Sequence, residues 1–186
     1  QDTGSADDAV ITTGALVVSA TTLNTVEVTP SGGAGGGVAI GGFEAAGSVG
    51  DADGNGATRA YIGDGARIVA SSIDVTADGT NDVYVDMLVV GVGVLSGAGG
   101  TSAASVAGQV QAFIDPGEKA DGTASIVVSG AVTVEALSSD VATANADGGA
   151  GGGISVSVLY ATVANTVETG AWIGSGAGLD VGSLDV

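Results

Sequence analysis

The chain of 186 residues contains no cysteine and no histidine. Without thiols it can form neither disulfides nor thiolate metal sites, and without imidazoles it lacks the usual ligands of a zinc site. A Ser-His-Asp catalytic triad is excluded for the same reason. No other catalytic constellation is apparent in the sequence, and we expect the protein not to be an enzyme.

Basic residues are almost absent. The three cations Arg59, Arg67 and Lys119 stand against 21 acidic residues, which gives a formal net charge of −18. Nucleic acid is excluded as a partner because its binding requires a basic surface, and anionic membranes are disfavoured for the same reason. The acidity is interpreted as a source of solubility and self-repulsion, or as an adaptation to salt or divalent cations outside the cell.

Long apolar runs are also missing. The longest, residues 87–95, is far too short for a membrane helix, so no membrane span is expected. The chain has 35 glycines, two prolines and a 45% share of hydrophobic residues, mainly valine and alanine. Short alternating runs of small and β-branched residues, separated by Gly, Asp and Asn, predict an all-β chain rather than a disordered one.

Residues 60–77 form the stretch that the rest of the chain repeats. They place an aromatic residue and Ile62 before a glycine turn, and then continue into a run in which every second residue is aliphatic or Ala. This period of two is typical of a strand with one buried face. Copies of the run begin at Leu16, Ile73, Val132 and Leu184, in steps of 57, 59 and 52 residues.

Two further elements recur in the same order. The glycine-rich run of residues 32–37 returns at residues 148–153, with a shorter copy at residues 96–100. An aromatic residue followed by Ile occurs at Tyr61, Phe113 and Trp172. Three elements in one order indicate internal repeats, which we divide into units 10–66, 67–124 and 125–178 and a partial fourth unit 179–186 of a single repeat domain.

Repeats of this kind predict a β-solenoid, a stack of strand-built coils that share one core. With a third of each 52–59-residue unit in one coil, the chain would form about nine coils along about 45 Å. The alternative is a set of stacked antiparallel hairpins, for example residues 82–95 paired with residues 101–114. Both arrangements require strands of period two, and the repetition favours the solenoid.

The stretch of residues 60–77, together with the GGAGGGVAIGG of residues 32–42, resembles the repeats of giant secreted bacterial adhesins. The likeness is to the leukotoxin-type filamentous adhesins and, more distantly, to filamentous haemagglutinin-like β-helices, and it covers about residues 10–186. The resemblance implies an extracellular, elongated β-solenoid at a bacterial cell surface. It names no functional residue.

One segment has the residue types of a calcium loop. Asp51, Asp53 and Asn55 alternate before Gly56, which matches the first half of an EF-hand loop. The bidentate Glu expected at the twelfth position is replaced by Ile62, so an EF-hand is excluded. A looser calcium site stays open beside the interpretation as an ordinary Asp/Asn/Gly turn, and calcium is the one cofactor that the sequence suggests.

Two rows of side chains are expected in a stacked fold. Tyr61, Phe113 and Trp172 would form an aromatic row that either fixes the register or grips sugar or a neighbouring chain. An outer acidic row would contain Asp74, Thr133, Glu135 and Asp185. Paired carboxylates occur in glycosidases, but a solvated face is the better interpretation of this row.

The predicted function is a structural or adhesive rod outside the cell. Open solenoid ends expose unpaired strand edges, and no capping helix is apparent in the sequence. Copies would therefore stack head to tail into a homopolymer, or the chain would be one part of a longer surface filament that meets other cell-surface components. The alternative function is a calcium- or carbohydrate-binding module of a bacterial adhesin.

Overall fold

The computed structural model describes residues 10–51, 56–117, 125–174 and 177–186. These residues are almost entirely β-strand, and no helix occurs among them. In chain order the strands are β1 (Val10–Val28), β2 (Ser31–Val49), β3 (Thr58–Ile62), β4 (Arg67–Ile114), β5 (Ile126–Ile173) and β6 (Leu179–Asp185). The prediction of an all-β chain is confirmed.

All the strand pairs formed by the described residues are parallel, and their register follows the repeat. In the first layer, β1, β2 and β3 together pair with β4; Leu16, for example, lies beside Ile73. In turn β4 pairs along its length with β5, and Ile73 lies beside Val132. The short β6 pairs with the start of β5. One repeat therefore forms one layer, and equivalent residues of successive repeats lie in columns.

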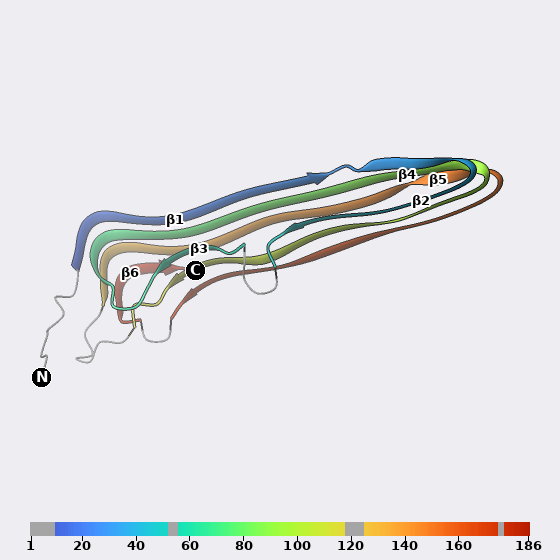
Figure 1. Ribbon diagram of the computed structural model, residues 1–186. Helices are drawn as coiled ribbons and strands as arrows, with labels where there is room; N and C mark the ends of the chain where they lie inside the picture. Colours follow the sequence, from blue (N-terminus) through green and yellow to red (C-terminus); the bar gives the residue numbers. More distant parts are fainter. Residues whose placement is uncertain (1–9, 52–55, 118–124, 175–176) are drawn as a thin grey trace, which may run out of the picture.

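Each layer is a long, flattened loop (Figure 1). In the middle layer, the outgoing limb runs through residues 67–94, the chain turns at a tip, and the return limb runs through residues 95–114. The tip is narrow: a Cβ on Gly91 would lie 2.6 Å from the carbonyl oxygen of Gly97. Only glycine permits that approach of the two limbs.

The core lies between the outgoing and return limbs. Near the base it contains Ile73 and Val75 of the outgoing limb together with Val110 and Ile114 of the return limb. Toward the tip, side chains such as Met87 pack with those of the return limb. Since neighbours along a strand point to opposite faces, every second residue fills this core and the others form the outer surface.

The hairpin alternative is wrong. Residues 82–95 pair with the outgoing limbs of the adjacent layers, not with residues 101–114 of their own layer. The two segments do lie opposite each other, but side chains fill the space between them. A period of two marks a half-buried strand and does not distinguish a partner reached by backbone hydrogen bonds from one reached by side chains.

The predicted coil length is also wrong. Paired residues are a whole repeat apart in the chain rather than a third of it, so the described residues form three full layers and the partial fourth layer of β6. At about 4.8 Å per layer the stack is only about 14 Å tall between the first and the fourth layer, whereas an outgoing limb of about 28 residues is on the order of 90 Å long. The molecule is a thin blade that is much longer across its layers than along the stack.

The described part of the chain contains no helix that is long and apolar enough to cross a membrane. The pairing of the strands is irregular near the base, where the register of β4 against β5 shifts between Ala70 and Ile73. The register of β5 against β6 shifts at the equivalent place, between Val128 and Ala131. These irregularities lie where the strands bend sharply at the base of the blade (Figure 1).

Candidate functional site

The three repeated aromatic residues form a stack, which we call the aromatic ladder. Tyr61 of β3, Phe113 of β4 and Trp172 of β5 lie in one column because the register pairs Tyr61 with Phe113 and Phe113 with Trp172. The ring centroids are 5.0 Å and 4.6 Å apart, and the ring planes differ by 9° and 7°. The sequence alone predicted this row.

The ladder lies on the outer surface of the return limbs. Tyr61 is 54% exposed and Trp172 is 36% exposed. Polar side chains lie beside it: Arg59 Nε donates a hydrogen bond to Gln111 Oε1 over 2.8 Å, and the Arg59 guanidinium also donates one to Gln109. The base of the blade thus presents aromatic edges next to amide and guanidinium groups.

Stacking limits what the ladder can bind. Both faces of Phe113 are covered by its neighbours, and Tyr61 and Trp172 each have one face covered by Phe113. A sugar ring that packs on an aromatic residue needs an uncovered ring face, which only the two outer rings offer here. The geometry therefore favours a ladder that fixes the register of the three layers over a strip that grips sugar.

A second ladder lies inside the stack and was not predicted from the sequence. Asn24 Nδ2 donates to Asn81 Oδ1 over 2.8 Å, and Asn81 Nδ2 donates to Asp140 Oδ1 over 2.6 Å. Ser138 also donates a hydrogen bond to the carboxylate of Asp140. The sequence could have predicted this ladder, because its three positions are separated by the same steps of 57 and 59 residues as the alternating runs.

The acidic side chains are staggered between layers. In no register pair of the described strands does an Asp or Glu lie beside another Asp or Glu. Asp74, for example, lies between Val17 and Thr133, and Glu168 lies beside Gln109. Like charges directly opposite each other destabilise a sheet, so this spacing lets a strongly acidic chain form a parallel stack in register.

The acidic row is brought together only in part. Asp74, Thr133 and Asp185 share one column, whereas Glu135 lies in the next outer column beside Thr76. Thr133 separates the two carboxylates of the first column, which places their Cα atoms about 10 Å apart. Thr76 Oγ1 donates to Asp74 Oδ1 over 2.9 Å within one strand. The arrangement is that of isolated carboxylates on an outer face.

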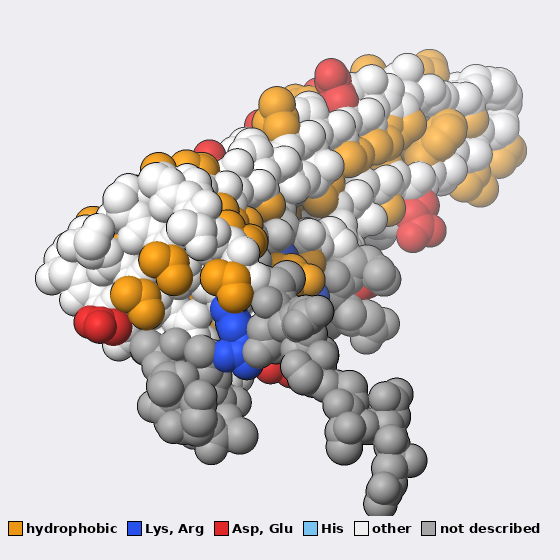
Figure 2. Space-filling model, turned by 90° about the vertical axis from the view of Figure 1, so that its left-hand side faces the viewer, with side chains coloured by type: hydrophobic (Ala, Val, Ile, Leu, Met, Phe, Trp, Pro, Cys, Tyr) orange, Lys and Arg blue, Asp and Glu red, His pale blue; other side chains and the backbone are white. Residues whose placement is uncertain are grey.

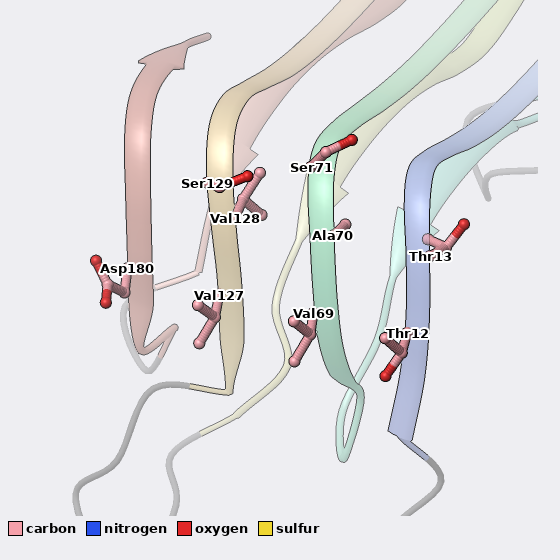
Figure 3. Close-up of a pocket in the computed structure, with 9 residues that line it drawn as sticks. All are labelled: Thr12, Thr13, Val69, Ala70, Ser71, Val127, Val128, Ser129 and Asp180. Carbon is pink, nitrogen blue, oxygen red and sulfur yellow. The ribbon is translucent and has the colours of Figure 1, made fainter.

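A groove of about 310 Å³ opens at the base, where β1, β4, β5 and β6 lie side by side (Figure 3). Thr12, Val69, Val127 and Asp180 form a row across it, one residue from each strand. Asp180 is the only ionisable residue among those that line the groove. The groove offers aliphatic and hydroxyl contacts but no pair of carboxylates for acid–base chemistry.

A second groove of about 280 Å³ lies where β1 ends and β2 begins. It is lined by Pro30 and Leu88 and by two carboxylates, Asp86 and Asp147. Asp147 is paired with Leu88 and Asp86 with Asn145, so the carboxylates lie diagonally in adjacent layers. The sequence analysis did not single out this pair, although Pro30 marks the break between the strands.

The calcium-loop prediction cannot be followed to all its residues. Asp51 is described, but Asp53 and Asn55 lie outside the described residues. Within the described part of the chain, no group of three or more Asp or Glu side chains is placed to hold a metal ion. The loop therefore stays a prediction from sequence.

Comparison with known proteins gives no relative. No protein-family model, no curated protein and no solved structure matches the chain.

Proposed function

We propose that the chain is a β-solenoid that serves as an extracellular structural or adhesive element at a bacterial surface, either as part of a longer array or by stacking of copies. The observation that carries the proposal is the register of the three layers. The same parallel contact joins the first layer to the second and the second to the third. A contact that repeats in this way can be continued by further layers, whether these belong to the same chain or to another copy.

The outer sides of the first and third layers fit this continuation. If another first layer followed β5 in the same register, Tyr61 would come to lie on Trp172, and Asn24 on Asp140. Glu135 would lie on Ser19, and Tyr160 on Glu44. The aromatic ladder would be extended and no carboxylate would meet another, so the continued stack would keep the features of the internal one.

The mechanism of such an element is mechanical. Backbone hydrogen bonds run along the stack, small aliphatic side chains fill the space between the limbs, and staggered carboxylates cover the outside of the base. The assignment to a secreted bacterial adhesin rests on the resemblance of residues 60–77 and 32–42. Neither mechanism nor location requires a catalytic residue or a bound cofactor.

The strand β6 affects the junction between two copies. It occupies the fourth-layer position that residues 11–17 of a following copy would take, because Leu184 lies beside Val132, which is equivalent to Leu16. Stacking of two copies in full register therefore requires β6, or the start of β1 in the next copy, to leave its place. A chain shortened to residue 178 should stack more readily than the full chain.

The test is negative-stain electron microscopy of the purified chain at micromolar concentration, with and without millimolar calcium, beside the form shortened to residue 178. Filaments whose axial repeat matches three layers, and which are more abundant for the shortened chain, would support stacking of copies. Single blades for both forms would reject that mode and leave a segment of a longer array. A sharp rise in thermal stability with calcium would instead favour the calcium-binding alternative.

A further inference from the structure

The charged side chains end before the tip of the blade: the last ones on the outgoing limbs are Asp86 and Asp147, which lies beside Leu88, and Glu44 lies beside Thr101 on the return side. No Asp, Glu, Lys or Arg occurs between Asp86 and Asp115, between Asp147 and Glu168, or between Glu27 and Glu44. Each stretch contains the tip of its layer, and we call the tip, together with the parts of both limbs next to it, the distal half. A chain of net charge −18 thus keeps an uncharged region around the tip, where two copies can approach each other with the least charge repulsion.

The distal half carries exposed aliphatic side chains on both sides of the blade. Those of layers one, two and three that are at least 40% exposed are Val38, Ile40, Leu88, Val90, Val92, Val94, Leu95, Ile154, Val156, Val158 and Val163. Figure 2 shows hydrophobic side chains in rows along the part of the molecule that recedes from the viewer. A contiguous apolar surface of this kind on an acidic protein indicates an interaction site.

On the outgoing side these residues form a ridge in the middle layer. Leu88, Val90, Val92 and Val94 point outward from β4, on the opposite side of the strand from Met87 and Val89 of the core. The positions beside the ridge in both neighbouring layers are glycine. In the register of β4 with β2 and β5, Val90 lies between Gly33 and Gly149. In the same way, Val92 lies between Gly35 and Gly151.

On the return side the pattern is reversed. Gly97 of the middle layer lies between Ile40 and Val156, and Gly99 lies beside Val158. An added Cβ on Gly97 would be 3.9 Å from Cγ1 of Ile40 and 3.8 Å from the carbonyl oxygen of Val156. The middle layer therefore forms the floor of a groove that has aliphatic walls on both sides at Gly97. At Gly99 the wall is on the third-layer side alone, because the first-layer neighbour is Gly42.

We propose that a second copy of the chain covers this surface, with the valine ridge of one copy seated in the glycine groove of the next. Val90 and Val92 would contact Gly97 and Gly99 of the neighbouring copy. The members of each pair are two residues apart, about 6.6 Å, and both features are one layer wide and flanked by layers about 4.8 Å away. The two faces match in spacing along the strand and across the layers.

The proposed contact has the size of a weak, repeated interface. The uncharged part of an outgoing face spans about 8 residues and three layers, on the order of 400 Å² per copy. This is about half the area that a stable pair of proteins buries on each partner. One such contact would be transient, but contacts repeated along a longer stack would add up to a stable bundle.

The symmetry of the contact determines the kind of assembly. Ridge and groove lie on opposite sides of the same blade, since the core separates the two limbs. A contact between unlike faces does not close on itself, so blades would add one after another. The inference rests on the proposed structural role and specifies how copies associate side by side, in a direction perpendicular to the layer stacking.

Sedimentation velocity across a concentration series tests the proposal with two matched variants. Val92→Asp places one carboxylate on the ridge between Gly35 and Gly151. Val69→Asp places the same charge on the same strand near the base, where Val69 is also exposed and lies between Thr12 and Val127. We expect Val92→Asp to reduce side-by-side association at least tenfold and Val69→Asp to leave it unchanged. Equal effects of the two variants, or no concentration dependence in the parent chain, would overturn the proposal.

Cysteine cross-linking identifies the faces that meet. The chain has no native cysteine, so Val92→Cys and Gly99→Cys each introduce a single thiol. In an equimolar mixture under mild oxidation, disulfides between the two variants should outnumber those within either variant by more than the statistical ratio. A statistical mixture would refute the assignment of ridge to groove.

This test is independent of layer stacking. The form shortened to residue 178 reports on stacking through the filament length, and Val92→Asp reports on lateral contact through the filament width. Filaments that stay single in Val92→Asp and bundle in the parent would support both proposals. Bundles that persist in Val92→Asp would contradict the lateral contact through the valine ridge. Short blades that still cross-link through residues 92 and 99 would contradict layer stacking but not the lateral contact.

Discussion

Asn81 shows how one residue joins three layers. It is 6% exposed, accepts a hydrogen bond from Asn24 and donates one to Asp140. Residues of two other repeats thus hold the Asn81 side chain in place. The amide specifies the register of the strands, because a slip of β4 by one residue would turn Asn81 to the outer face and break both hydrogen bonds.

Replacement of Asn81 by Ala should lower the free energy of unfolding by about 1–3 kcal/mol, because it leaves Asn24 and Asp140 without these bonds in a partly buried place. Urea unfolding followed by circular dichroism measures the change. The control is Asn24→Ala, which removes one bond instead of two and should cost less. Equal costs for the two variants would contradict the ladder.

Single residues also keep the carboxylates of successive layers apart. Thr133 separates Asp74 from Asp185 in one outer column. Thr133→Asp would place three carboxylates in successive layers and should destabilise the fold, by about 1 kcal/mol at low salt and by less at high salt. Thr133→Asn has a similar shape without the charge and serves as the control. If both variants lose the same stability and neither responds to salt, charge spacing is not a constraint on the stack.

At the scale of the element, the aromatic ladder illustrates what repetition in the sequence can predict. Tyr61, Phe113 and Trp172 were assigned to one row from their place in the repeat, and their rings stack. The Asn24–Asn81–Asp140 ladder has the same spacing and was overlooked, because polar residues in alternating strands were assumed to face solvent. Aligning the repeats column by column would have found it.

The limbs show what the sequence could not predict. Alternation defined which residues of β4 face the core, but not whether the opposite limb was joined by hydrogen bonds or by side-chain packing. It also left the length of one coil undefined, because glycine-rich turns occur within and between strands; residues 96–100, for example, are part of β4. Only the hydrogen-bonded partner distinguishes these arrangements, and that partner is a whole repeat away in the chain.

Phe113 should contribute more to stability than Tyr61, because it stacks on two rings and Tyr61 stacks on one. Each stacked pair contributes about 0.5–1.5 kcal/mol beyond burial. Phe113→Ala is therefore expected to cost about 1–3 kcal/mol more than the loss of its buried area, and Tyr61→Ala about half of that excess. Thermal unfolding of both variants measures the difference, and a larger cost at Tyr61 would show that the ladder does not fix the register.

At the scale of the whole molecule, the blade divides into two halves with different surfaces. The base carries the aromatic ladder and the groove of Figure 3, and the charged side chains extend from the base along the limbs as far as Asp86 and Asp147. The tip and the residues next to it are uncharged, and the core toward the tip is a separate cluster from that of the base, although the same limbs contribute to both. This division was present in the sequence as long intervals without charge, but it acquired a meaning only when the register placed the three intervals in adjacent layers.

The central claim is that each repeat forms one layer in parallel register with the next. It is tested most directly by a disulfide between Ser19 and Thr76, which are paired outward-facing residues of β1 and β4. Their Cα atoms should be about 4.8 Å apart, within the range of a disulfide. The double variant Ser19→Cys with Thr76→Cys should close an intramolecular bond rapidly under mild oxidation. The control, Ser19→Cys with Ala77→Cys, should not, because Ala77 points into the core. Rapid closure in the first pair alone is the result we predict, whereas failure of the first pair or equal closure of both would contradict the layered register.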